Sequence, residues 1–131
     1  MADRALLITN NPDFTSLAGV KADMRYVDGD ALDVLIAARD LAHKGWLLAN
    51  HPLYGNFRPH QQPYRSLVML PPREHEASQE LCTPLYFLEE ALALYQGPTP
   101  RCSPGTVPEH YRADCALIDR ELLRATLESL A

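Results

Sequence analysis

The sequence predicts an α/β fold: a single small three-layer domain in which a mostly parallel four-stranded sheet is flanked by helices. Two short apolar runs, 5–9 (ALLIT) and 66–70 (SLVML), have the pattern of strands buried on both faces. Residues 24–49 read as a strand, a helix and a strand, a unit whose two strands run parallel with a right-handed crossover. The 131 residues suffice for one sizeable core and are too few for two ordinary domains, so we expect residues 1–131 to form a single domain.

The first two strands are bounded by turn signals. The strand at 5–9 ends at Asn10-Asn11-Pro12, because Asn and Pro are typical turn residues and Pro cannot continue a sheet ladder. Residues 13–22 show no clear periodicity. Residues 24–27 predict the second strand, and the VDGD that begins at Val27 supplies the break after it.

A helix is predicted after this break. Asp30 is suited to cap it, and Asp33 in the first turn is favourable beside the positive end of the helix dipole. Lys44 and Gly45 are the residue types expected at its end. One face carries the apolar side chains of Ala31, Val34, Leu35, Ala38, Leu41 and Ala42. The third strand follows at 46–49.

A long loop, 50–65, separates the third strand from the fourth at 66–70. Loops of this length in a compact domain are usually functional or disordered, and the three prolines Pro52, Pro59 and Pro63 favour an ordered one. Because a long loop without a helix permits either direction, the sequence leaves the direction of the fourth strand open.

The C-terminal part predicts two helices joined by a linker. Thr83 is suited to cap a helix whose first residue is Pro84 and which ends at Gly97-Pro98. A Pro-rich linker, 98–108, is expected to be an exposed, semi-rigid connection. The last helix is predicted over 114–129. Its packing side chains are expected to be Ile118, Leu122, Leu123, Leu127 and Leu130, and its outward side chains Asp119, Arg120 and Arg124.

The clearest signal of function is a window without acidic residues, 41–73, in a chain whose net charge is -5. Fixed cations and hydrogen-bonding side chains among rigid turns are typical of a loop that receives a carboxylate or phosphate. If the first and third strands are parallel, Asn10-Asn11 and Asn50-His51 leave the sheet at the same carboxyl edge, where ligands bind in open α/β sheets. The predicted ligand-binding residues are Asn10, Asn11, His51, Gly55, Arg58, Tyr64 and Arg65.

Each of these residues also has a structural interpretation. His51 is the best catalytic candidate as a general acid or base, yet it could equally be a turn histidine bonded to the backbone. Arg58 and Arg65 could grip an anion in bidentate fashion or lie solvated on the surface. Gly55 suits a tight turn or a close backbone approach, and Tyr64 a pocket wall or a support beneath the loop. No nucleophile lies at a recognisable spacing from His51, so the sequence leaves enzymatic activity undecided.

Several classes of protein lack their usual signals. The chain has neither GxxxxGK nor GxGxxG, the usual phosphate-binding motifs of nucleotide hydrolases and dinucleotide-binding proteins, so the sequence gives no support to either function. The histidines lack metal-ligand spacing, and the three cysteines form no close pair. Four cations in the acid-free window are too few for a nucleic-acid surface. No apolar run could span a bilayer and no signal-peptide layout is present, so we expect a cytoplasmic protein with no membrane contact, cofactor or metal.

Two segments resemble the signature stretches of the GrdX family, small proteins encoded beside the glycine, sarcosine and betaine reductase genes. They are LLITNNP at 6–12 and HPLYGNFRPHQQPYRS at 51–66. The segments 45–48 (GWLL) and 88–91 (LEEA) add to the resemblance, whereas the linker segment 102–105 (CSPG) departs from it. The resemblance implies a setting in amino-acid reduction and carries no assigned activity.

From these observations we expect a GrdX-like accessory protein that binds a small anion. Two alternatives stay open. One is a small enzyme that uses His51 as acid or base while Arg58 stabilises developing negative charge. The other is an interaction module whose helices at 84–97 and 114–129 cover a partner, either reductase subunits or a second copy in a homodimer.

Overall fold

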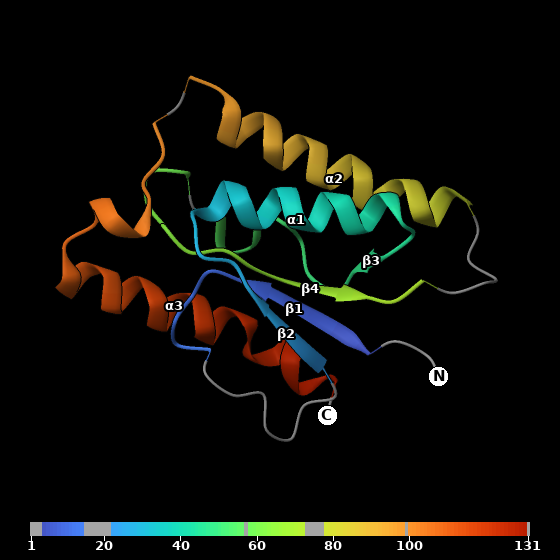
Figure 1. The fold of residues 1–131 in the computed structure, drawn as a ribbon, viewed down its shortest axis with the longest axis horizontal. Helices are drawn as coiled ribbons and strands as arrows, with labels where there is room; N and C mark the ends of the chain where they lie inside the picture. Colours follow the sequence, from blue (N-terminus) through green and yellow to red (C-terminus); the bar gives the residue numbers. More distant parts are fainter. Residues whose placement is uncertain (1–3, 15–21, 57, 73–77, 99, 131) are drawn as a thin grey trace.

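The computed structural model describes residues 4–14, 22–56, 58–72, 78–98 and 100–130. Within these residues the chain forms a four-stranded sheet and three α-helices (Figure 1). The strands are β1 (Ala5–Thr9), β2 (Ala22–Tyr26), β3 (Leu47–Leu48) and β4 (Ser66–Leu70). The helices are α1 (Ala31–His43), α2 (Ser78–Gln96) and α3 (Glu109–Glu128), with short 3-10 turns η1 (Tyr54–Asn56) and η2 (Pro104–Thr106).

The helices cover both faces of the sheet. Helices α1 and α2 pack side by side on one face, and α3 lies on the other (Figure 1). Because neighbouring residues of a strand point to opposite faces, β4 divides its side chains between the two layers. Leu67 and Met69 join the core beneath α1 and α2, whereas Val68 packs with Leu123 and Leu127 of α3. The predicted α/β class is confirmed.

The prediction of a mostly parallel sheet is wrong. The strand order is β2-β1-β4-β3, and only β1 and β2 pair in parallel, whereas β4 is antiparallel to both of its neighbours. The loop between β3 and β4 contains no crossover helix, so the chain turns back and β4 inserts between β1 and β3. Strands β1, β2 and β3 nevertheless all run in the same direction, because β4 opposes both β1 and β3.

Helix α1 has the predicted boundaries. The Asp30 side chain accepts the Asp33 N–H and the Asp33 side chain accepts the Asp30 N–H, which is a reciprocal capping box. Gly45 follows the helix with a φ of 93°, a left-handed conformation that favours glycine. Five residues of the predicted apolar face are buried: Ala31, Val34, Leu35, Ala38 and Ala42.

Helix α2 begins earlier than predicted. It starts at Ser78, and Pro84, which we expected at its first position, lies inside it. Proline removes one intrahelical hydrogen bond without ending this helix. The helix still ends at Gln96, immediately before the Gly97-Pro98 stop signal.

Helix α3 presents a different face to the sheet from the one predicted. Leu123 and Leu127 are buried as expected, but Ile118 and Leu122 are 43% and 44% exposed, and Asp119 is buried at 1% exposure. The inward positions therefore follow the spacing Ala116, Asp119, Leu123 and Leu127. The prediction that Asp119 points outward is wrong, because polar groups across the sheet edge stabilise its carboxylate, as described below.

Within the described part of the linker, Cys102 lies against the loop between β3 and β4. The Cys102 N–H donates to the Pro59 carbonyl at 3.1 Å. Arg101 reaches Asp30 at the start of α1 at 3.4 Å. No helix in the described part of the chain has the length and apolar character needed to cross a membrane.

Candidate functional site

The predicted site residues border one edge of the sheet. Strands β1, β2 and β3 end at this edge, and β4 begins there opposite Thr9, which pairs with Ser66. The turn η2 and the N-terminal ends of α1 and α3 lie at the same end of the fold, on the left of Figure 1. Loops far apart in the sequence therefore meet at the carboxyl edge of β1 and β2.

Asn10 joins three of these loops. Its side-chain amide donates to the Gly29 carbonyl at 3.1 Å and to the Pro63 carbonyl at 3.0 Å. Its side-chain oxygen accepts the Arg65 N–H at 2.9 Å. Asn10 is only 2% exposed, so its hydrogen-bonding groups serve mainly to hold the start of β4 against the end of β1.

A buried carboxylate organises the edge on the α3 side. Asp119 accepts hydrogen bonds from the Asn11 side-chain amide at 2.9 Å and from the Ser66 hydroxyl at 2.6 Å. It also accepts a hydrogen bond from the Tyr54 hydroxyl. Because a buried carboxylate without partners is costly, these three donors explain how α3 tolerates Asp119 on its inner face. We call Asn11, Tyr54, Ser66 and Asp119 the Asp119 network.

Tyr54 is held in its protonated form within this network. Burial raises the pKa of Tyr54 well above its ordinary value, and the nearby Asp119 charge acts in the same direction. The Arg65 charge acts in the opposite direction without reversing the shift. The Tyr54 hydroxyl therefore remains a donor to Asp119, while its oxygen accepts the Ser66 N–H at 2.7 Å.

Arg65 is a buried cation rather than a surface one. It is 0% exposed, and its guanidinium donates to the Tyr54 carbonyl at 3.0 Å and to the Tyr95 hydroxyl at 2.8 Å. The guanidinium carbon also lies 4.6 Å from the centre of the Tyr54 ring, a cation–π distance. Its Nε is buried without a hydrogen-bond partner. Arg65 thus ties the loop to α2 and is closed to solvent in this structure.

Two predicted residues border a cavity at the carboxyl edge. Asn10 and Tyr64 line a cavity of about 580 Å³ together with Tyr26, Arg112 and the acidic residues Asp28, Asp30 and Asp33. Burial raises the pKa of Tyr64, and the Arg112 charge partly opposes that rise. We call this space the edge cavity; it combines one cation with three carboxylates.

His51 lines a different cavity. This space of about 500 Å³ lies between β3 and α2 and is bordered mainly by apolar side chains, among them Leu48, Pro84 and Phe87. The His51 Nδ1 accepts the Leu53 N–H at 3.0 Å, so His51 is indeed a turn histidine bonded to the backbone. Its ring centre lies 4.8 Å from that of Phe87. We call this space the β3–α2 cavity.

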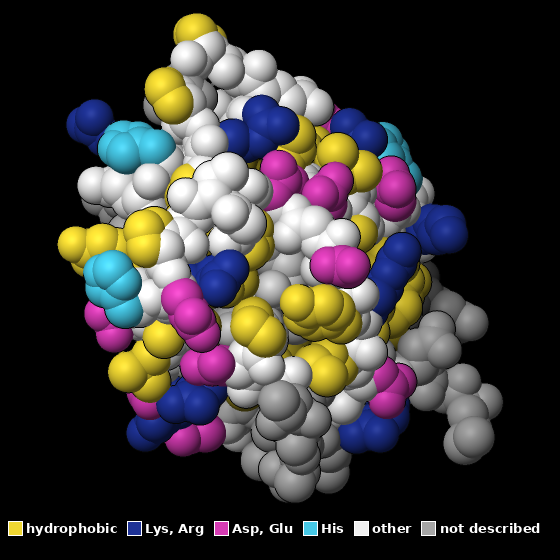
Figure 2. Space-filling model, turned by 60° about the vertical axis from the view of Figure 1, so that its left-hand side comes forward, with side chains coloured by type: hydrophobic (Ala, Val, Ile, Leu, Met, Phe, Trp, Pro, Cys, Tyr) yellow, Lys and Arg dark blue, Asp and Glu magenta, His cyan; other side chains and the backbone are white. Residues whose placement is uncertain are grey.

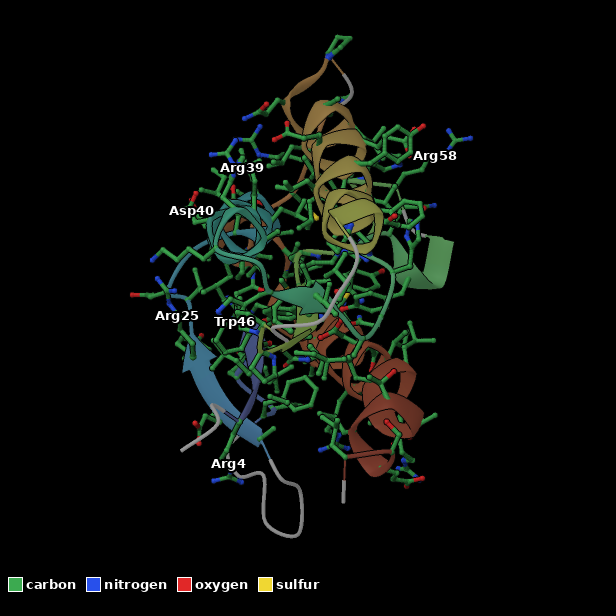
Figure 3. All side chains as sticks on the ribbon, turned by 90° about the vertical axis from the view of Figure 1, so that its right-hand side faces the viewer. Arg4, Arg25, Arg39, Asp40, Trp46 and Arg58 are labelled. Carbon is green, nitrogen blue, oxygen red and sulfur yellow. The ribbon has the colours of Figure 1, made fainter. Side chains whose placement is uncertain are left out.

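Arg58 and Gly55 lie outside both cavities. Arg58 is exposed, and Figure 3 shows its side chain extending away from the fold. Gly55 is exposed in η1 with a φ of 77°, so it serves the turn. The structure therefore distributes the seven predicted residues among a buried network, two cavities and the surface. Ligand binding by this set as a whole stays a prediction.

The face around the edge carries both signs of charge. Figure 2 brings the left-hand side of Figure 1 forward and shows Lys and Arg side chains interspersed with Asp and Glu. The acid-free window of the sequence does not produce a uniformly positive surface here, because α1 and α3 contribute carboxylates. An anion at this edge would depend on a local cation such as Arg112.

Sequence reasoning missed Asp119, Tyr54 and Arg112. Asp119 lies three residues after buried Ala116 and four before buried Leu123, which is a helical spacing. That spacing could have identified Asp119 as an inward carboxylate. No sequence signal identifies Arg112 as a cavity residue, because most of its neighbours there, such as Asn10, Tyr26 and Asp33, are distant in the chain. The Arg112 guanidinium also donates to the Pro104 carbonyl at 3.1 Å.

The fold and its cavities define a small three-layer α/β protein with two ligand-sized spaces and a buried polar network at one end of the sheet. The chain matches the family model for GrdX-like protein over residues 6–128. It therefore belongs to the GrdX-like family, and this membership suggests an association with glycine reductase. No curated protein and no solved structure matches the chain.

Proposed function

We propose that this GrdX-like protein is an accessory protein of a glycine, sarcosine or betaine reductase system that binds a small ligand carrying a carboxylate in the edge cavity. The observation that carries the proposal is that one cation, Arg112, and three carboxylates, those of Asp28, Asp30 and Asp33, line the same cavity. A guanidinium binds a carboxylate, and carboxylates bind an ammonium group. A zwitterion such as glycine or betaine offers both groups.

The state of the lining side chains supports this assignment. Asp30 and Asp33 are engaged in the α1 capping box, and Asp30 also pairs with Arg101. Asp28 makes no hydrogen bond or ion pair with any described residue, so its carboxylate is available to a cationic group. Tyr26 and Tyr64 add aromatic rings, which attract ammonium groups and most of all methylated ones.

The ligand class can be tested by thermal shift and calorimetry at low salt with glycine, sarcosine, betaine, acetate and phosphate. Selective binding to the folded state stabilises it by about 2.7 kcal/mol when the ligand is at 100 times its Kd. We expect the three zwitterions to raise the Tm more than acetate or phosphate at equal concentration. A response to phosphate alone would favour a simple anion site, and no response to any of the five would contradict the proposal.

Three variants locate the site. Arg112→Gln and Asp28→Asn each remove one charge from the cavity lining and should weaken binding of a zwitterion. Arg58→Gln is the matched control, because it removes an exposed guanidinium outside the cavity. Loss of binding in the Arg58 variant, with full binding in the other two, would move the site to the loop after β3.

The enzymatic alternative receives little support from the geometry. It requires Arg58 to act beside His51, but no hydrogen bond or other contact joins these two described side chains. The Arg58 N–H bonds to the Gln61 side chain at 2.8 Å, and its guanidinium extends into solvent. A binding role is therefore the better-supported proposal.

A further inference from the structure

The β3–α2 cavity has a chemistry that the edge cavity lacks. No Asp or Glu among the residues whose side chains the structure describes lines it, and five of its lining residues are apolar: Leu47, Leu48, Ala49, Pro84 and Phe87. Its volume of about 500 Å³ falls within the range of small-molecule sites. We propose that this cavity is a second binding site, for a monocarboxylate with an apolar body whose carboxylate accepts a hydrogen bond from His51.

The tautomer of His51 follows from its backbone contact. Nδ1 accepts the Leu53 N–H at 3.0 Å, and a ring nitrogen that accepts a hydrogen bond carries no proton. In the neutral imidazole the proton therefore resides on Nε2, which becomes a donor. The turn and the contact with the Phe87 ring, 4.8 Å away between centres, restrain the orientation of this donor.

The other polar side chain in the segment after β3, that of Asn50, is already hydrogen-bonded. The Asn50 side-chain amide donates to the Ser66 carbonyl at 3.2 Å, and its oxygen accepts the Val68 N–H at 2.8 Å. Asn50 therefore serves chiefly to hold the end of β3 against β4. The Nε2–H group of His51 is therefore the side-chain donor that we assign to a ligand in this cavity.

Charge favours an anionic headgroup over a cationic one. His51 lies inside the acid-free window 41–73, and the rest of the described lining comes from β3, the two residues after it, Thr83 and the apolar residues of α2. A carboxylate therefore meets no negative residue in the described lining, in contrast with the three carboxylates of the edge cavity. The apolar walls favour a body that is poorly hydrated.

Calorimetric titration of the full chain with octanoate tests the site, with 1-octanol and acetate as comparators. The first comparator has the apolar body without the charge, and the second has the carboxylate without the body. We expect octanoate to bind at least tenfold more tightly than either. Equal affinity for octanoate and 1-octanol would overturn the proposed carboxylate contact.

His51→Asn separates the two roles of the imidazole. An Asn side-chain oxygen can still accept the Leu53 N–H in the turn, but the donor at the Nε2 position is lost. We expect octanoate binding to weaken at least fivefold while 1-octanol binding is unchanged. His60→Asn, at an exposed histidine outside the cavity lining, is the matched control and should alter neither. Unchanged octanoate affinity in His51→Asn would refute the proposal.

Methyl NMR of the wild-type protein provides a readout that does not depend on a variant. Octanoate should shift the methyl resonances of Leu47, Leu48 and Ala49, which line the cavity. Shifts confined to other parts of the chain would overturn the site. Glycine binding in the edge cavity is measured separately, so failure of either proposal leaves the other standing.

Discussion

Asn11 and His51 both follow strands that run toward the same edge of the sheet, but the structure gives them opposite environments. Asn11 is 0% exposed and bonds to Asp119 of α3, whereas His51 is exposed beside a cavity. The difference lies in the covering helix, because α3 closes over the ends of β1 and β4 with a carboxylate of its own. A polar side chain at a strand end thus becomes structural or accessible according to what packs over it.

The largest loss of stability should come from a substitution in the Asp119 network, on the buried side of the edge. Asp119→Ala leaves the Tyr54 hydroxyl without its acceptor. It also removes one of two partners from the Asn11 amide, which keeps the Ala116 carbonyl, and from the Ser66 hydroxyl, which keeps Thr9. Leaving a buried hydrogen-bond donor without a partner costs about 1–3 kcal/mol, so we expect the free energy of unfolding in urea to fall by about that amount. Asp114→Ala, at an exposed position on the same helix, is the control and should leave the urea midpoint unchanged.

A smaller effect should appear at alkaline pH. The folded pKa of Tyr54 lies above its unfolded value of 10.0, so the unfolded chain loses this proton first as the pH rises. The stability due to Tyr54 is fully present below pH 10 and declines from there toward the folded pKa, by about 1.4 kcal/mol per pH unit.

Urea unfolding at a series of pH values above 10 measures this slope. Tyr54→Phe should remove the Tyr54 contribution, whereas Tyr111→Phe, at a tyrosine that is 58% exposed, should retain the wild-type slope. If the Tyr54→Phe protein keeps the same slope as the wild type, the network does not hold Tyr54 protonated.

The smallest effect is expected on the exposed side. His51→Asn retains the acceptor for the Leu53 N–H, and Arg58→Ala removes a side chain that extends into solvent. Neither change should move the urea midpoint beyond experimental error, since surface substitutions away from caps and networks are usually close to neutral. A large loss of stability in either variant would contradict the proposed difference between the buried Asp119 network and the exposed His51 and Arg58.

The family, the α/β class and several local features could be predicted from the sequence. The Asp30 cap and Gly45 end of α1, and the two buried strands β1 and β4, depend on residues close together in the chain. The same local reasoning gave the wrong start for α2, because a proline that often begins a helix can also be tolerated within one. It also gave the wrong face for the N-terminal part of α3, where apolar residues occur on more than one side.

The sequence by itself determined where β1, β4 and the caps of α1 form, because backbone hydrogen bonds and turn preferences act over a few neighbouring residues. The starts of α2 and α3, at Ser78 and Glu109, both lie earlier than the sequence predicted. Only the tertiary structure decided the direction of β4, the burial of Arg65 and the inward position of Asp119. These outcomes depend on contacts between residues far apart in the chain, such as the bond from Asn11 to Asp119 across 108 positions. A local sequence pattern does not identify the distant donor that will bond to a carboxylate. The division of the predicted site residues between a buried network and two cavities therefore follows only from the tertiary structure.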